Sequence, residues 1–188
     1  MLKRLFVLIC LLLLSACASV PDGVHPAAWL KPGVRVSLPQ AGLTPAIQAH
    51  QLLTSRYRER EHALMVVLDA DARRLSLVGL SMVGVRLFTV QYDERGLQAR
   101  QEIVAPGLPP AAQVLSDIML SYWPVAAWQA VLPAGWHLVD EGLQRQLLDP
   151  QGEVVTRVDY EEASGGRRPV QVRQTAFGYE IHIRNLDD

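Results

Sequence analysis

Short segments in which apolar and polar residues alternate follow one another along most of this chain. In the last of them, Tyr179, Ile181 and Ile183 are separated by charged or polar residues. A period of two is typical of a β-strand with one apolar face and one solvent-exposed face. The pattern therefore predicts an antiparallel sheet that is covered on one side only.

Nine further segments have a strand-like composition, and turn residues separate them. The ten predicted strands are 51–59, 63–68, 75–80, 85–92, 99–104, 136–139, 143–148, 154–160, 169–174 and 179–186. Residues 161–168 are predicted to form a polar loop. Because the segments follow in hairpin order, we expect each strand to pair with its neighbour in the sequence.

The middle of the chain has a different character. Residues 106–110 are rich in Pro and Gly, and apolar residues then recur at helical spacing over 111–120 and again over 125–132. The fold class expected is mainly β (α+β): an incomplete antiparallel half-barrel of about ten strands with a mid-chain helical lid. Either side chains fill its concave face, or a lipid-sized cavity remains there.

The N-terminus has the features of a secretory signal. Lys3 and Arg4 precede an apolar run over residues 5–14, and small residues follow it. The run is about half the roughly 20 residues that a membrane-spanning helix needs. We predict a signal peptide over 1–16, a lipid-anchored Pro/Gly-rich tether over 17–45 and a single domain over 46–188.

The sequence Leu14-Ser15-Ala16-Cys17 resembles the bacterial lipobox. This resemblance implies cleavage before Cys17 and attachment of diacylglyceryl and acyl chains, palmitate among them, to that residue. Ala18 in the next position implies transport to the periplasmic face of the outer membrane. Since Cys10 would be removed with the signal, no disulfide within the mature chain is expected.

Few residues suggest catalysis. The formal net charge of −1 gives no basic excess for a nucleic-acid partner. Ser81 lies in a near match to the nucleophile elbow, but Val83 occupies the position where that motif needs glycine. The five histidines show no HExxH spacing. We predict that the protein is not an enzyme and that it binds no cofactor or metal.

Large apolar side chains are the more informative candidates. Trp123 and Trp128 lie in the helical insertion, where such residues either fill a core or line a ligand cavity. The residues expected near a cavity between the sheet and the helices are Leu53, Tyr57, Leu75, Leu77, Leu115, Ile118, Met119, Trp123, Trp128, Tyr179 and Ile181.

Several of these segments resemble the LolB family, whose members receive other lipoproteins at the outer membrane. Residues 75–88 resemble its strand–turn–strand, and residues 115–135 resemble its lid helices. The resemblance implies a LolA/LolB-like fold with an acyl-binding cavity, and it makes Met82 and Val83 a membrane-insertion loop. Val83 stands where that family has leucine.

A closer resemblance is to an uncharacterised bacterial lipoprotein family of the same fold, often encoded with enzymes that build aryl-polyene lipids. It rests on residues 79–88, Tyr92-Asp93, 108–110 and 122–124.

These resemblances predict an outer-membrane carrier or receptor for a lipid or acylated molecule. Its partners would be an acyl chain, the membrane and a periplasmic carrier or envelope protein. The alternative is a structural lipoprotein that docks a protein complex and binds no small ligand, and the weakest hypothesis is a hydrolase.

Overall fold

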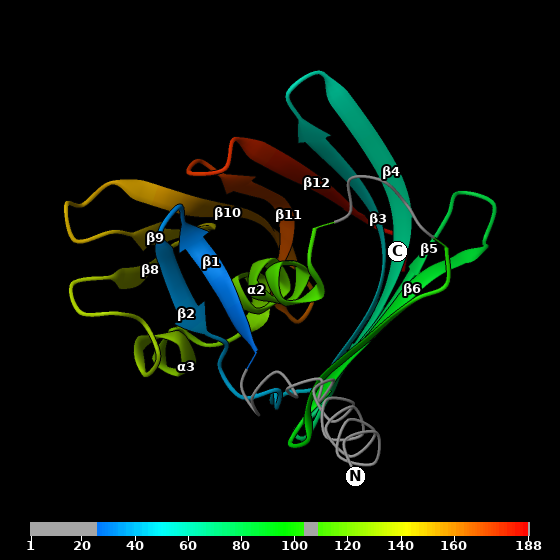
Figure 1. Cartoon of the computed structure of the whole chain (residues 1–188), viewed down its shortest axis with the longest axis horizontal. Coiled ribbons are helices and arrows are strands. Elements are labelled where there is room, and N and C mark those ends of the chain that lie inside the picture. Colours follow the sequence, from blue (N-terminus) through cyan, green and yellow to red (C-terminus); the bar gives the residue numbers. More distant parts are fainter. Residues whose placement is uncertain (1–25, 104–108, 188) are drawn as a thin grey trace, which may run out of the picture.

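A computed structural model describes residues 26–103 and 109–187, and it consists mainly of antiparallel strands with few helices (Figure 1). Ten strands form one open sheet in the order β7-β6-β5-β4-β3-β12-β11-β10-β9-β8. The strands of this sheet are β3 (Ile47–Tyr57), β4 (Arg60–Ala70), β5 (Leu75–Leu80), β6 (Arg86–Asp93), β7 (Gly96–Gln101), β8 (His137–Glu141), β9 (Gln144–Leu148), β10 (Val154–Ala163), β11 (Gly166–Gln174) and β12 (Tyr179–Asn185). The sheet curves without closing, so the predicted incomplete half-barrel is confirmed.

All ten predicted strands and both predicted helices are present, with shifts at their ends. The helices are α2 (Ala111–Tyr122) and α3 (Val125–Gln129). The predicted polar loop 161–168 is wrong, because β10 and β11 continue through it and pair as far as Ala163 and Gly166. Polar residues on both faces made this hairpin resemble a loop.

The topology explains why the helices cover the concave face. The chain forms a meander from β3 outward to the edge strand β7, and a second meander from the other edge strand β8 back to β12. β12 then pairs with β3 in the middle of the sheet. The connection from β7 to β8 must therefore cross the sheet, and α2 lies inside the curve (Figure 1). Among the described residues, neither helix has the length and apolarity needed to cross a bilayer.

The predicted tether is wrong for residues 26–45, which are part of the folded domain. β1 (Ala27–Lys31) and β2 (Val34–Ser37) form a separate hairpin. Leu30 and Leu38 are buried in the main core, and the backbone N–H of Leu43 donates to Asp71 O at 2.8 Å. The prolines and glycines of this segment shape its turns and irregular path, a role that composition alone does not distinguish from an extended linker.

The two faces of the sheet differ in the way that the last strand predicts. Ile181 and Ile183 pack with Val158 and Val172 on the concave face, while His182 and Arg184 are exposed on the convex face. The main core lies between the concave face of the sheet, with β4–β6 on one side and β8–β10 on the other, the helices α2 and α3, and the β1–β2 hairpin. Side chains on this inner surface are therefore the ones that any ligand of a half-barrel would contact.

Candidate functional site

The predicted cavity residues divide into two groups in the structure. Six of them are at most 1% exposed and belong to the main core: Leu75, Leu77, Leu115, Met119, Trp123 and Trp128. In this packing they contact other core side chains. Both indoles also use their N–H groups, Trp123 toward Gln40 O at 2.9 Å and Trp128 toward Met119 O at 3.0 Å.

The remaining predicted residues are less buried. Leu53, Ile118 and Ile181 are partly exposed, and Tyr57 is 47% exposed. Tyr179 is partly exposed and donates its hydroxyl to a buried carboxylate.

An apolar surface on the concave face is built from two neighbouring rows of the sheet. Leu53 of β3 pairs with Ile183 of β12 on one side and with Leu64 of β4 on the other. Ile181 is the neighbouring inward-facing residue of β12. Leu53, Leu64 and Ile118 from α2 also pack against the main core. All five side chains are partly exposed, so they can still contact a ligand. We call Leu53, Leu64, Ile118, Ile181 and Ile183 the concave strip.

A polar row borders the concave strip. Gln51 of β3 pairs with Asn185 of β12. These two are the inward-facing residues next to Leu53 and Ile183 along their strands. Gln51 Nε2 donates to Asn185 Oδ1 and to Tyr122 Oη, both at 2.8 Å. Tyr122 is the last residue of α2, so this row also connects the helix to the middle of the sheet.

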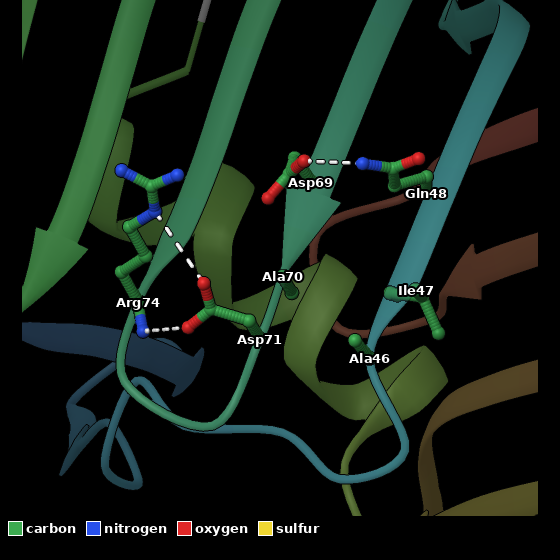
Figure 2. Close-up of a pocket in the computed structure, with 7 residues that line it drawn as sticks. All are labelled: Ala46, Ile47, Gln48, Asp69, Ala70, Asp71 and Arg74. Atoms are coloured by element: carbon green, nitrogen blue, oxygen red, sulfur yellow. Dashed lines mark hydrogen bonds and ion pairs between the residues drawn. The ribbon is translucent and has the colours of Figure 1, made fainter.

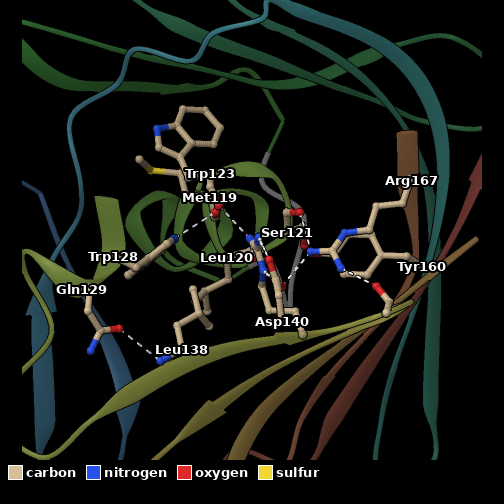
Figure 3. Close-up of polar contacts among 12 residues, drawn as sticks. Met119, Leu120, Ser121, Trp123, Trp128, Gln129, Leu138, Asp140, Tyr160 and Arg167 are labelled. Carbon is tan, nitrogen blue, oxygen red and sulfur yellow. Dashed lines mark hydrogen bonds and ion pairs between the residues drawn. The ribbon is translucent and has the colours of Figure 1, made fainter. Parts of the chain in front are cut away.

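The C-terminal end of α2 is held by a buried arginine that sequence reasoning missed. Arg145 of β9 donates from Nη1 to Leu120 O at 2.8 Å and to Trp123 O at 2.7 Å. Its Nε and Nη2 bind the two oxygens of Asp140 at 2.7 and 2.8 Å. Tyr160 completes the attachment by donating to Ser121 O at 2.8 Å (Figure 3).

This network has favourable electrostatics. A cation at a helix C-terminus satisfies carbonyls that lack helical partners and complements the helix dipole. Asp140 also pairs with Arg167, whose guanidinium stacks on Tyr160 at 4.0 Å. Hydrogen bonds from Arg145, together with the charge of Arg167, lower the pKa of Asp140. The carboxylate therefore stays ionised, and the end of α2 is fixed beside the polar row.

A second buried carboxylate fixes the middle of α2. Asp117 accepts a hydrogen bond from Tyr179 Oη at 2.6 Å and one from Gln174 Nε2 at 2.9 Å. The described residues give it no cationic partner. Burial raises the pKa of Asp117 to about 6, although both hydrogen bonds act to lower it. Asp117 therefore takes up a proton more readily in the folded protein than in the unfolded chain.

This raised pKa predicts that Asp117 makes the domain less stable as the pH rises. Its contribution to the free energy of unfolding is full below pH 4 and is lost as the pH passes 6. A shift from 3.8 to about 6 corresponds to about 3 kcal/mol. Unfolding in urea between pH 4 and 8 should show Asp117→Asn gaining stability relative to the native protein as pH rises. A constant difference between the two proteins would contradict this.

The predicted insertion loop is the exposed turn between β5 and β6. Met82 is 55% and Val83 85% exposed. Ser81 closes the turn, since its N–H donates to Val85 O and its Oγ accepts from Val85 N. Gly84 has φ of +80°, a value that suits glycine. The serine therefore has a structural role in the turn.

A surface recess lies at the other end of β5, beside the turn that connects β4 to β5 (Figure 2). Gln48 donates to Asp69 at 2.9 Å, and the Arg74 backbone N–H donates to Asp71 at 3.1 Å. The polar groups of the recess thus hydrogen-bond with one another. None of the predicted cavity residues lines this recess, and in the described parts of the chain no three His, Cys, Asp or Glu side chains are grouped to bind a metal.

The predicted lipidation residue, Cys17, lies outside the described residues. The polar residues that fix α2, namely Gln51, Asp117 and Arg145, carry no sequence signal, because each is an isolated polar residue within an otherwise ordinary strand or helix.

A family model described as "Protein of unknown function (DUF3261)" matches residues 48–187. The match covers the ten-stranded sheet from the second residue of β3 onward, together with both helices, and it leaves out the β1–β2 hairpin. No curated protein matches the chain.

Proposed function

Since the chain belongs to the DUF3261 family of unknown function, we propose a function from its own residues: a non-enzymatic carrier or receptor for a lipid or acylated molecule. The observation that supports this most is the concave strip, which leaves five apolar side chains partly exposed inside a curved sheet. Burial of apolar surface stabilises by about 25 cal/mol per Å², so an acyl chain on this strip would be held without any charged contact.

The strip can contact part of an acyl chain. Across the sheet, Ile183, Leu53 and Leu64 span two strand spacings, about 10 Å, and Ile181 extends the strip by about 7 Å along β12. Several methylene groups of an extended chain fit on a surface of this size. The six fully buried predicted residues would then form the floor beneath the ligand, and the concave strip would form its contact surface.

We place this function at the periplasmic face of the outer membrane, through lipidation of Cys17. The similarity to LolB supports transport of lipoproteins, and the similarity to the aryl-polyene-associated family supports transport of polyene lipids. Met82 and Val83 would contact the membrane, because exposed apolar side chains at a turn tip suit insertion between lipid headgroups.

Replacing Cys17 by serine is expected to move the protein from the membrane fraction to the soluble or unprocessed precursor fraction, because serine cannot form the thioether. Fractionation of cells and globomycin treatment measure this. Cys10→Ser is the matched control and should leave the fractionation unchanged. Processed Cys17→Ser protein that remains in the outer-membrane fraction would contradict the proposed anchor.

The carrier function itself is tested by photocrosslinking. The full-length protein in detergent is irradiated with a diazirine-bearing palmitic acid, and labelled peptides are located by mass spectrometry. Labels are expected on β3, β12 and α2, where the concave strip lies. Labelling spread evenly over the surface, without preference for these elements, would argue against a carrier.

One observation favours the alternative of a docking lipoprotein. The convex face is mostly polar, but an apolar patch lies on its β3–β5 part: Leu52, Met65, Val67, Val78 and Leu80. Leu80 is the last residue of β5, so the patch reaches the turn that carries Met82 and Val83. Recovery of one stoichiometric protein partner through the patch, with no lipid on the concave strip, would favour this alternative.

A further inference from the structure

The polar row beside the concave strip contains two hydrogen-bond donors without an acceptor. Asn185 Nδ2 is buried and has no partner, since Asn185 uses only its Oδ1 to accept from Gln51. The Tyr122 hydroxyl accepts from Gln51 Nε2, and its own proton has no acceptor among the described residues. Buried polar groups in folded proteins are normally paired, so the unpaired Asn185 amide and the unpaired Tyr122 hydroxyl proton need an explanation.

The donors lie next to the apolar surface. Asn185 and Gln51 occupy the inward register position adjacent to Ile183 and Leu53. Tyr122 follows Ile118 by one helical turn, which places both on the same ridge of α2. A molecule with an apolar chain on Leu53 and Ile183 would therefore bring its next group against Tyr122 and Asn185.

The local electrostatics favour an electron-rich group there. Burial raises the pKa of Tyr122 to about 12, while the hydrogen bond from Gln51 and the charge of Arg168 act to lower it. The hydroxyl thus keeps its proton at neutral pH and remains a donor. Arg168 contributes a positive potential at this point, and it also pairs with Glu161 at 2.6 Å.

We infer that Tyr122 and Asn185 form a subsite for the oxygen atoms of a carboxylate or ester head at the end of an acyl chain. Tyr122 Oη–H and Asn185 Nδ2–H donate to the head oxygens, and Gln51 orients both groups. The concave strip holds the chain. This subsite rests on the proposed carrier function and specifies the chemistry of the ligand's polar end.

The test uses the same photoreactive palmitic acid on the full-length protein, with palmitate and hexadecanol as competitors. The two competitors share a chain length and differ in the head. Because hydrogen bonds to a charged acceptor are the stronger ones, palmitate should compete about tenfold more effectively than hexadecanol for labelling of the strip.

Tyr122→Phe and Asn185→Leu should each reduce this preference for palmitate, while hexadecanol still competes. Retained competition by hexadecanol shows that the variants fold and keep the strip. Tyr92→Phe is the matched control, because its hydroxyl donates to Pro39 O in the core at 2.9 Å. It should leave the preference unchanged.

The outcomes separate the two proposals. If the strip is labelled and both competitors act equally, or if both variants keep the preference, the donors only bind ordered water and the subsite is wrong. If the native protein shows no specific labelling of the strip, the carrier function fails, and the subsite fails with it.

Discussion

Replacing Arg145 by methionine is expected to lower the free energy of unfolding by about 3–5 kcal/mol, the range for breaking a buried ion pair from one side. Methionine keeps most of the apolar stem but removes four short hydrogen bonds. Leu120 O and Trp123 O would then lack their partners at the end of α2. Chemical denaturation followed by tryptophan fluorescence measures the change.

Arg157→Met is the matched control for this prediction. Arg157 also forms an ion pair with an aspartate on the sheet, at 2.9 Å, but its side chain is about one third exposed on the convex face. Exposed pairs contribute about 0–1 kcal/mol, so a small change is expected. Equal losses in the two variants would show that Arg145 does not anchor the helix.

Replacing Leu53 by arginine is expected to weaken labelling of the concave strip by about 10–100-fold. Leu53 lies at the centre of the strip, between Leu64 and Ile183. Losing the burial of one leucine side chain removes about 1.5–3 kcal/mol, and each 1.4 kcal/mol corresponds to a factor of ten in affinity. Titration with the photoreactive palmitic acid measures the loss.

Leu52→Arg controls for general effects of arginine in β3. Leu52 is the neighbouring residue, is also partly exposed and points to the convex face. This variant should keep native labelling by the lipid. If the docking function is the correct one, Leu52→Arg should instead abolish recovery of the protein partner, and Leu53→Arg should not.

The sequence predicts the sheet well because period-two alternation is a local property. The alternation in β12 correctly separates Ile181 and Ile183 from His182 and Arg184, and the breaker before Ala111 correctly predicts the helical insertion. The order of strands follows from hairpin connections, apart from the central pairing of β3 with β12. That contact joins the two ends of the domain and has no local signal.

The candidate site was less predictable for physical reasons. Trp123 and Trp128 have the composition of a cavity lining, but cores and pockets use the same residue types, and here both are core residues. Whether residues 26–45 form a tether or a hairpin depends on long-range contacts such as Tyr92 Oη with Pro39 O. Arg145 and Asp117 become significant only when folding brings α2 beside them.

The central claim is that the concave strip holds an acyl lipid. Native mass spectrometry of the full-length protein, released from bacterial membranes in a mild detergent, tests it most directly. We expect one lipid mass beyond any covalent anchor, retained by Leu52→Arg and lost from Leu53→Arg. Absence of a bound lipid from the native protein, or equal retention by Leu53→Arg, would contradict the account.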